Sequence, residues 1–364
     1  EIFFETDVHS VNIFLVGHTG LIGKTLLKQI HEQFDYLMKE KSIQINVTGI
    51  INSKKMLIDS NGINLKKWNT QLEEKGETSS IESFTNKIID LNFANSVFVD
   101  CSASKHVVEY YEKLLKKSVS IVTPNKIANT LSQEKYVRLR ELAKKSNARF
   151  MYETNVGAGL PIIGVLQSLL TSGDKILKIE AVLSGTLSFI FNTFKDNLKF
   201  SEVVLDAKAK GFTEPDPRDD LSGLDVARKA LILSRDCGAK MELSDIAVEN
   251  LVPENLRDVD VKTFLTKLPD VDASYEKLKN DAERKGNVLR YMAVIENGKV
   301  AIELKQVDSQ HPFYNLSGSD NMIVFTTERY KTNPLVIKGP GAGAEVTAAG
   351  VFAEIITIGN YMAS

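Results

Sequence analysis

The chain has 364 residues, of which 43% are hydrophobic and 25% are charged, a composition typical of a soluble globular protein. This length suggests two domains. Lys plus Arg number 45 and Asp plus Glu number 47, so the net charge of −2 gives no electrostatic reason to expect nucleic acid or a membrane surface as a partner. No apolar run approaches the roughly 18 residues that a transmembrane helix needs.

The first residues and the cysteines argue against a secreted protein. Residues Glu1 to Phe4 lack the basic start and apolar core of a signal peptide. They also lack an initiator Met, so we expect the chain to come from a longer one. Two cysteines, Cys101 and Cys237, are too few for a disulfide framework and favour a reducing, cytoplasmic setting. The histidines are scattered without zinc-ligand spacing, so we expect no zinc site.

The first expected strand, Val11 to Val16, is a short apolar run of the kind buried in a parallel sheet. A glycine-rich turn follows it, and then a helix from Lys24 to Lys39. Strand, turn and helix in this order form the first half of a βαβ unit that binds a dinucleotide. Glycines allow a tight turn and close approach of a pyrophosphate, which the unpaired N–H groups at the helix start favour.

The residues of this turn are the first candidates for cofactor binding: Gly17, Thr19, Gly20, Leu21, Ile22 and Gly23. Their spacing is GxxGxxG, and Thr19 stands where the usual GxGxxG pattern has its second glycine. The geometry of the turn could therefore differ from the common one. The alternative interpretation is a glycine-rich connection that binds no ligand.

The second expected strand, Ile43 to Ile51, leads into a polar, basic loop. Sites that prefer NAD usually carry Asp or Glu at this point, to bind the ribose 2′-hydroxyl. Here the residues are Asn52, Ser53, Lys54 and Lys55, with no acid. Lysine can neutralise a 2′-phosphate, so we expect NADP to be accepted as well as NAD. The alternative is that both lysines are solvated loop charges.

Two more strands end in polar residues. Ser96 to Asp100 is followed by Ser102 and Ala103, and Val119 to Val122 is followed by Thr123 to Lys126. A helix from Val107 to Lys117 is expected between them. Alternating strands and helices predict a doubly wound parallel sheet.

From Met151 the pattern changes to a glycine-rich loop and extended stretches. The extended stretches are Lys178 to Leu183, Leu289 to Ile295 and Lys299 to Val307, and Asn297-Gly298 predicts a hairpin between the last two. We therefore expect an α/β protein with a Rossmann-like doubly wound sheet and a second, α+β domain. The first would contain residues 1–150, completed by 335–364 with a final helix from Val346 to Ile358, and the second residues 151–334.

The densest cluster of charged residues lies between Gly211 and Lys229. Asp225 and Lys229 are four residues apart on a helix that is otherwise apolar, so they share one face and can pair. A desolvated Lys has a tunable proton affinity, as a general acid or base requires. Glu214, Asp219 and Asp220 nearby could bind an ammonium group, which points to an amino-acid substrate. The alternative is a structural salt bridge.

Several segments resemble the homoserine dehydrogenases. The segment GFTEPDPRDDLSGLDVARKALIL, from Gly211 to Leu233, closely matches the signature of that family. Further matches follow in family order along almost the whole chain: TPNK at Thr123, ETNVGAGLP at Glu153, LSGTLS at Leu183, and GPGAG at Gly339 with VTAAGV after it. The chain looks most like the dehydrogenase part of aspartokinase–homoserine dehydrogenase fusions.

The resemblance implies a reaction and the residues that perform it. NAD(P)H would reduce L-aspartate 4-semialdehyde to L-homoserine. Lys229 would donate the proton to the aldehyde oxygen, Asp225 would hold Lys229, and Lys126 would lie beside the nicotinamide and substrate. Glu214 would bind the substrate ammonium with Asp220 nearby, and Gly185 and Thr186 would line the pocket.

The resemblance also implies cofactor, metal and assembly features. Ser102, where many relatives have Thr, would contact the nicotinamide ribose, and Gly343 would approach the cofactor. A sodium ion would be held by backbone oxygens of Glu153, Val156, Ala158 and Leu160. The second domain would bind the substrate and form a homodimer with a second copy of the chain. An aspartokinase region would lie upstream in the parent chain.

Two other classes of protein compete with this interpretation. An aspartate-semialdehyde dehydrogenase also uses a GxxGxxG turn, but it needs a Cys nucleophile with a His base. No motif places a histidine beside Cys101 or Cys237. A regulatory domain that binds nucleotide or amino acid without turnover would have no need for Lys126 or Lys229, and both are present.

Overall fold

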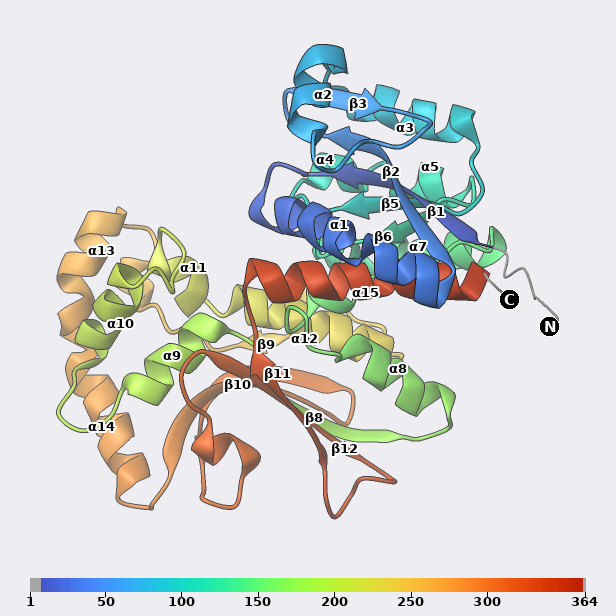
Figure 1. Ribbon diagram of the computed structural model, residues 1–364. Coiled ribbons are helices and arrows are strands. Elements are labelled where there is room, and N and C mark those ends of the chain that lie inside the picture. Colours follow the sequence, from blue (N-terminus) through green and yellow to red (C-terminus); the bar gives the residue numbers. More distant parts are fainter. Residues whose placement is uncertain (1–7, 363–364) are drawn as a thin grey trace. The chain divides into compact units, whose positions relative to one another are not determined.

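The computed structural model describes residues 8–362. Residues 160–342 form one compact unit, and the rest of the described chain forms another. Each unit has its own sheet (Figure 1). The expected α/β class, with a Rossmann-like parallel sheet and a second sheet of mixed direction, is confirmed.

The first unit contains a seven-stranded sheet in the order β4-β3-β2-β1-β5-β6-β7. Its strands are β1 (His9–Val16), β2 (Ile43–Ile51), β3 (Lys55–Ile58), β4 (Glu77–Thr78), β5 (Ser96–Asp100), β6 (Ser120–Val122) and β7 (Phe150–Met151). β1 pairs in parallel with β2 on one side and β5 on the other, so the winding of the chain reverses at β1. Ligands of such sheets bind outside the carboxyl ends of the strands at this reversal.

Helices cover both faces of this sheet. They are α1 (Leu21–Lys41), α2 (Trp68–Lys75), α3 (Ile81–Leu91), α4 (Lys105–Val108), α5 (Tyr111–Leu115), α6 (Ile127–Thr130), α7 (Gln133–Lys145) and α15 (Ala344–Met362), with the 3₁₀ turn η1 (Glu153–Asn155). The apolar stripe of α1 packs on one face beside α15, and the two helices run next to each other in Figure 1. α3, α5 and α7 bury their apolar side chains on the other face.

The second unit contains a six-stranded sheet in the order β13-β12-β8-β10-β11-β9. Its strands are β8 (Ile176–Val182), β9 (Ala247–Val248), β10 (Val288–Glu296), β11 (Lys299–Val307), β12 (Asp320–Thr327) and β13 (Leu335–Pro340). The predicted hairpin is confirmed as the antiparallel pair β10–β11. Asn297 and Gly298 both have positive φ (52° and 73°), as a two-residue type I′ turn requires.

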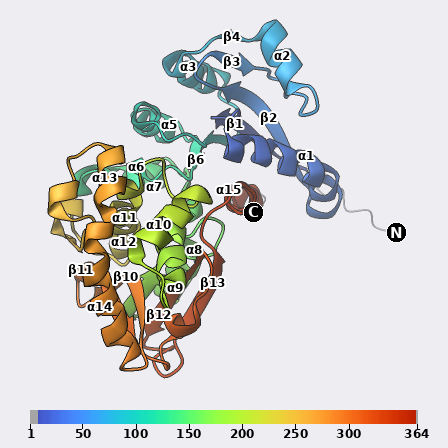
Figure 2. The same ribbon diagram turned by 90° about the vertical axis from the view of Figure 1, so that its left-hand side faces the viewer.

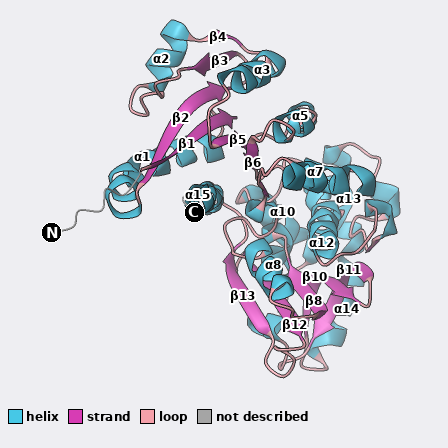
Figure 3. Cartoon of the chain, turned by 90° about the vertical axis from the view of Figure 1, so that its right-hand side faces the viewer, coloured by secondary structure: helices cyan, strands magenta, loops and turns pink. Residues whose placement is uncertain are grey.

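The helices of the second unit gather mainly on one side of its sheet (Figure 3). They are α8 (Ile163–Thr171), α9 (Gly185–Thr193), α10 (Phe200–Ala209), α11 (Pro217–Leu221), α12 (Leu224–Asp236), α13 (Val261–Lys267) and α14 (Asp272–Glu283), with 3₁₀ turns η2 (Leu243–Asp245), η3 (Glu254–Leu256), η4 (Leu268–Val271) and η5 (Pro312–Asn315). α9 and α12 contact the central strand β10, and α10 packs against α14 (Figure 2).

Two expected elements differ from the structure. The helix expected from Val107 to Lys117 is broken into α4 and α5, and the break allows the buried Tyr111 hydroxyl to reach Asp100 at 2.6 Å. The two prolines between Glu214 and Arg218 predict a wholly extended or turned backbone for that stretch. Instead α11 begins at Pro217, because Pro suits the first helical position and Asp216 caps the helix by accepting from the Arg218 N–H.

None of the helices between residues 8 and 362 has an apolar stretch long enough to cross a membrane.

Candidate active site

The glycine turn after β1 has the geometry of a phosphate cradle. Gly17 has a φ of +82°, and the Gly20 N–H donates to its carbonyl at 3.0 Å. A Cβ on Gly23 would lie 2.3 Å from the Gly17 oxygen, so only glycine lets α1 start this close to the turn. Gly20 precedes Leu21 at the start of α1 and has no side chain to cap the helix, and the first turn contains no acidic residue. The exposed helix start therefore fits an anionic pyrophosphate.

A hollow of about 600 Å³ lies at the carboxyl ends of β1, β2 and β5 in the first unit. Gly17, Asn52, Ser53 and Ser102 are among the residues that line it. The turn after β2 is rigid, because the Asn52 carboxamide oxygen accepts from the backbone N–H groups of Lys54 and Lys55, both at 2.8 Å. The hollow has the place and size that an adenosine would need.

The two lysines of this turn differ in their surroundings. The Lys55 ammonium lies 2.5 Å from the Glu73 carboxylate and is therefore paired within the protein. Lys54 is exposed, and within the described residues its side chain has no ion pair. Lys54 and Ser53 are thus the side chains of this turn that remain for a phosphate.

Polar residues from the ends of two strands, β5 and β6, meet beside the turn. Asp100, the last residue of β5, accepts hydrogen bonds from Ser102 and from Asn125. Burial raises the pKa of Asp100, and those hydrogen bonds oppose the rise. Lys126 directly precedes α6 and is partly buried. The structure therefore brings Ser102 and the Lys126 loop together at one edge of the sheet, while Ala103 next to Ser102 is exposed.

His18, which the sequence analysis did not single out, lies inside the glycine turn. It is 0% exposed and packs edge-on against Trp68 with ring centres 5.1 Å apart. Its Nδ1 has no hydrogen-bond partner in the described part of the chain, and burial lowers the pKa of the ring. Thr19 beside it is exposed. The signal in the sequence was a histidine directly after a strand-ending glycine, but only the structure shows that it is buried.

Gly343 directly precedes α15 and has a φ of +128°, a conformation that side chains rarely adopt. Its carbonyl accepts from the Thr347 N–H at 3.1 Å, and so helps to start the helix. The nearest contact of a Cβ there would be Val346 at 3.6 Å, so backbone conformation favours glycine at this position more than crowding does.

In the second unit, Lys229 on α12 is held at two points. Its ammonium lies 2.8 Å from the Asp225 carboxylate one helical turn earlier and 2.8 Å from the Leu183 carbonyl at the end of β8. The Lys229 side chain is only 11% exposed. The predicted pairing of Asp225 and Lys229 is therefore present, and the anchor at Leu183 adds a fixed direction that sequence spacing did not show.

The residues expected to bind substrate lie in the same unit as Lys229, on segments close to its Leu183 anchor. Thr186, just after Leu183, donates to the Asp220 carboxylate at 2.9 Å, and the Glu214 N–H donates to the other Asp220 oxygen at 2.8 Å. Burial raises the pKa of Asp220 while these two hydrogen bonds oppose the rise. The Glu214 side chain is exposed. A Cβ on Gly185 would lie 3.2 Å from the Ser319 oxygen, so a larger residue there would crowd the loop that precedes β12.

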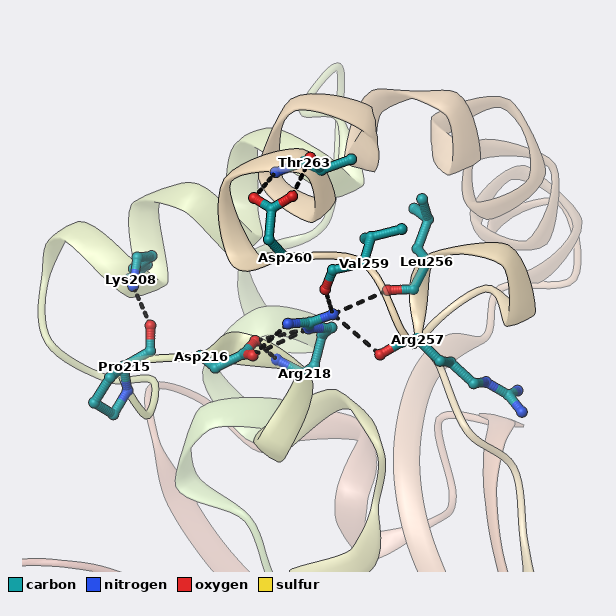
Figure 4. Close-up of polar contacts among 9 residues, drawn as sticks. All are labelled: Lys208, Pro215, Asp216, Arg218, Leu256, Arg257, Val259, Asp260 and Thr263. Atoms are coloured by element: carbon teal, nitrogen blue, oxygen red, sulfur yellow. Dashed lines mark hydrogen bonds and ion pairs between the residues drawn. The ribbon is translucent and has the colours of Figure 1, made fainter.

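Arg218 fixes the segment that carries Glu214 and, on α11, Asp220, a role the sequence did not reveal. Its guanidinium forms a fork with the Asp216 carboxylate (closest distance 2.7 Å) and donates to three backbone carbonyls between Leu256 and Val259 (Figure 4). Lys208 secures the same loop by donating to the Pro215 carbonyl. Within the charged cluster from Gly211 to Lys229, the charges of Asp216 and Arg218 are therefore structural.

The loop matched to a sodium site has features of its own. Ala158 has a positive φ of 54°, and the Leu160 carbonyl accepts from the Ile162 N–H at 2.9 Å. The Glu153 N–H donates to one oxygen of Glu354 on α15 at 2.7 Å, while the other oxygen is buried and has no hydrogen-bond partner among residues 8–362. Burial raises the pKa of Glu354 to about 8. An unpartnered carboxylate oxygen beside this loop fits a cation.

The side chains offer no other metal site, since no group of three His, Cys, Asp or Glu within residues 8–362 could hold an ion.

The two cysteines do not have the properties of a nucleophile. Burial raises the pKa of Cys237 to about 12, and burial together with the charge of Asp100 raises the pKa of Cys101 even further. A catalytic thiol needs the opposite shift. The surroundings of both thiols therefore argue against the cysteine chemistry of an aspartate-semialdehyde dehydrogenase.

Comparisons with known proteins agree with the motifs. A family model described as "Homoserine dehydrogenase" matches residues 161–356, and one described as "Homoserine dehydrogenase, NAD binding domain" matches residues 19–153. The chain is 48% identical over 347 residues to the chloroplastic bifunctional aspartokinase/homoserine dehydrogenase 2 of Arabidopsis thaliana. That match covers 94% of this chain but 38% of the plant protein.

Two further relatives match along almost their whole length. The homoserine dehydrogenase of Schizosaccharomyces pombe is 41% identical over 360 residues, covering 96% of this chain and 95% of the yeast protein. A solved structure of a hyperthermophilic archaeal homoserine dehydrogenase in complex with NADPH has a TM-score of 0.73 and 26% identity, covering 97% of this chain and 98% of that one.

Proposed function

This chain belongs to the homoserine dehydrogenase family, and on that premise we propose that it interconverts L-aspartate 4-semialdehyde and L-homoserine with NAD(P)H, in the biosynthesis of threonine and methionine from aspartate. The observation that carries the proposal is the Lys229 ammonium, held 2.8 Å from Asp225 and 2.8 Å from the Leu183 carbonyl. A desolvated, doubly anchored ammonium is suited to stabilise and protonate a developing alkoxide.

The first unit, predicted as the dinucleotide-binding domain, is assigned the cofactor. Its candidate contacts are the turn from Gly17 to Gly23 for the pyrophosphate, Asn52, Ser53 and Lys54 for the adenosine ribose, and Ser102, Ala103, Lys126 and Gly343 for the nicotinamide end. The NADPH bound to the archaeal relative supports a phosphorylated cofactor. When bound, the reduced nicotinamide supplies the hydride that reaches C4 of the semialdehyde.

Lys229 performs the proton transfer. As hydride arrives at C4, negative charge develops on the aldehyde oxygen, and the Lys229 ammonium stabilises it and then gives it a proton. The products are the primary alcohol and a neutral Lys229 amine, which regains its proton from solvent. Asp225 holds the ammonium in a fixed direction. In the oxidative direction the neutral amine removes the hydroxyl proton.

The second unit is assigned the amino-acid end of the substrate. The exposed Glu214 carboxylate binds the ammonium group, and Asp220 orients the loop by accepting from Thr186 and from the Glu214 backbone. Gly185 and Thr186 form the start of α9, next to Leu183, which anchors Lys229. Asp220 and Lys229 thus both contact the segment from Leu183 to Thr186 after β8, which links recognition to proton transfer.

A sodium ion is proposed at the loop of Glu153, Val156, Ala158 and Leu160. The support is the buried, unpartnered oxygen of Glu354 beside this loop. The ion would act by fixing the backbone of the loop. Equilibrium dialysis with sodium, comparing the natural chain with Glu354→Ala, tests whether such a site exists.

Assembly and location are also proposals. The chain spans 38% of the length of the plant relative, whose name includes an aspartokinase, so a kinase region upstream in the parent chain is proposed. A homodimer through the second unit and a reducing, cytoplasmic location are proposed from the family resemblance and the two free thiols. Neither nucleic acid nor a membrane is proposed as a partner.

The test is the absorbance at 340 nm with L-homoserine and NAD or NADP. The natural chain should show a homoserine-dependent rise. Lys229→Ala should lower kcat by about 10²–10⁴-fold with a much smaller change in KM. Lys229→Arg should be as inactive as Lys229→Ala although it keeps the positive charge, because a guanidinium does not give up its proton.

Lys240→Ala, which removes an exposed lysine after α12, is the matched control and should behave like the natural chain. Near-normal turnover in Lys229→Ala would remove Lys229 from the chemistry. A natural chain that binds NADP but gives no rise with homoserine would overturn the proposed function.

A further inference from the structure

Asp100 is a buried carboxylate at the centre of the first unit, and its surroundings are unusual. It is 0% exposed at the carboxyl end of β5. One oxygen accepts from the backbone N–H and the hydroxyl of Ser102, at 2.8 and 2.6 Å. The other accepts from the hydroxyl of Tyr111 at 2.6 Å and the amide of Asn125 at 3.1 Å. Within the described residues no cation pairs with it, so four fixed hydrogen bonds stabilise the carboxylate.

These hydrogen bonds join segments that are far apart in sequence. Ser102 lies on the loop after β5, while Asn125 lies on the loop after β6 and directly precedes Lys126. Thr123 adds a second link, because its hydroxyl donates to the Asp100 carbonyl at 2.7 Å and accepts from the Asn125 N–H at 2.9 Å. Asp100 is therefore the hub that fixes the Ser102 loop relative to the Lys126 loop.

The hub also fixes which way each donor points. The Ser102 hydroxyl gives its only proton to Asp100 and accepts from the Ser104 N–H at 3.2 Å. Its remaining lone pair can only accept, which suits a ribose hydroxyl as donor. The Asn125 oxygen accepts from the Ile127 N–H at 3.1 Å, so its amide nitrogen must face Asp100. Neither side chain can reverse without losing a partner.

We propose that Asp100 is a positioning residue for hydride transfer: it holds Ser102 and the Lys126 loop where the nicotinamide end of the cofactor binds. This inference rests on the proposed function, which assigns Ser102 and Lys126 to the nicotinamide. Asp100 touches neither cofactor nor substrate in this role. Its effect is on the alignment of the reacting groups, to which rates are very sensitive.

Asp100→Asn is the most informative variant, because the side chain keeps its size and shape but can no longer accept all four hydrogen bonds. If the new amide nitrogen faces Ser102, it meets the Ser102 N–H, and if it faces the other way, it meets the Asn125 amide. In either orientation two donors oppose each other, so one of the two loops must shift. Asp90→Asn, an exposed Asp to Asn change on α3 of the same unit, is the matched control.

Three measurements on the whole chain test the proposal. Amide hydrogen exchange without cofactor should speed up by about tenfold or more in residues 102–104 and 125–127 of Asp100→Asn. The kcat for homoserine oxidation should fall by about 10- to 100-fold, while KM for homoserine stays within about threefold. The deuterium isotope effect with homoserine labelled at C4 should rise, because hydride transfer becomes slower relative to other steps.

Cofactor affinity is a separate readout. Trp68, the single tryptophan, packs 5.1 Å from His18 in the phosphate turn, so its fluorescence should report NADP binding. The dissociation constant in Asp100→Asn should stay within about threefold of the natural value, because the phosphate turn and the β2 end are unchanged. A large loss of NADP binding with an unchanged isotope effect would overturn the positioning role in favour of a binding role.

Milder variants decide the matter if Asp100→Asn does not fold. Thr123→Val removes the hydroxyl that links Asp100 to Asn125, and Thr123→Ser keeps it. The proposal expects Thr123→Val to lower kcat and raise the isotope effect, and Thr123→Ser to restore both. Equal kcat and isotope effects in Thr123→Val and the natural chain would overturn it.

The failure of this inference differs from that of the proposed function. An active natural chain with an equally active, folded Asp100→Asn overturns only the role of Asp100. A natural chain that binds NADP without oxidising homoserine overturns the proposed function. In that case hydrogen exchange still tests Asp100, because equal exchange rates of residues 102–104 and 125–127 in Asp100→Asn and the natural chain would contradict its role in fixing the two loops.

Discussion

Lys229 shows at the scale of one residue how the fold makes a flexible side chain directional. Its four-carbon stem would normally sample many rotamers. The Asp225 carboxylate four residues earlier on α12 restrains the ammonium from one side, and the Leu183 carbonyl at the end of β8 restrains it from another. These two contacts fix the direction of the ammonium group. The first anchor follows from helical spacing, and the second depends on how β8 and α12 pack.

The two lysines after β2 should contribute differently to cofactor choice. We expect Lys54→Ala to weaken NADP binding by about tenfold, the value of one charge-assisted phosphate contact, and to leave NAD binding unchanged. Lys55→Ala is the matched control, because the Lys55 ammonium is paired with Glu73. Titration of Trp68 fluorescence with each cofactor measures both effects. Equal losses for NAD and NADP, or a larger loss in Lys55→Ala, would contradict this assignment.

His18 should make the stability of the first unit sensitive to acid. Burial lowers its pKa below the ordinary value of 6.5, so the unfolded chain takes up a proton at a higher pH than the folded chain. The corresponding stability is present above pH 6.5 and is lost as the pH falls through the folded pKa. His18→Phe removes the titrating group, and its loss of stability between pH 8 and pH 5 should be smaller.

Urea unfolding at pH 5 and pH 8, followed by Trp68 fluorescence, measures this difference. His31→Phe, which removes an exposed histidine on α1, is the control and should keep the pH dependence of the natural chain. Identical pH dependence in His18→Phe and the natural chain would show that another group is responsible.

At the scale of elements, the start of α1 is fixed by contact with the strand end that precedes it. Gly23 lies in the first turn of α1 and touches the backbone of Gly17 and His18. The close contact draws the helix start, with its unpaired N–H groups, over the carboxyl end of β1. This is the arrangement that an anionic pyrophosphate requires.

Gly23→Ala should push the start of α1 away from the carboxyl end of β1. Its Cβ would lie 2.3 Å from the Gly17 oxygen and 2.7 Å from the His18 Cα, and backbone atoms cannot give way cheaply. We expect a loss of stability of about 1–3 kcal/mol and a marked loss of NADP affinity. Thermal melting and the Trp68 titration measure the two effects.

Gly20→Ala provides the comparison for stability, because its Cβ would meet nothing closer than 3.4 Å. It should melt nearer to the natural chain than Gly23→Ala does. If both variants melted alike, the close contact of α1 with the turn would not be what makes Gly23 necessary.

At the scale of the whole molecule, the last helix completes the first unit rather than the second. α15 follows β13 in sequence but packs against α1 and η1. Its buried side chains join the core formed by α1, β1 and β2: Ala348, Val351, Phe352, Ile355 and Ile358. The chain therefore leaves the first unit after Gly159 and returns to it at Gly343.

A chain that ends at Ala342 should lose the first unit. At about 1.5–3 kcal/mol for each large side chain, the four apolar contacts beyond Ala348 are comparable with the whole stability of a domain. Hydrogen exchange should show lost protection in residues 8–159 with β8, β10 and β12 still protected, and NADP should no longer change Trp68 fluorescence. Retained NADP binding in the shortened chain would contradict this prediction.

The sequence by itself determined the features that depend on neighbouring residues. Alternation of apolar runs with glycine-rich turns indicated the α/β sheet, Asn297-Gly298 indicated the β10–β11 hairpin, and the spacing of Asp225 and Lys229 indicated an ion pair. These are set within a few residues by backbone conformation and helical period, so they can be deduced without the fold.

Only the tertiary structure decided the features that join distant segments. It separated Lys54 from Lys55 by pairing the latter with Glu73, buried His18 against Trp68, and turned Arg218 to the carbonyls near Leu256. It also collected donors from two loops around Asp100. A polar side chain accepts whichever partner packing brings within about 3 Å, and sequence periodicity contains no information about that partner.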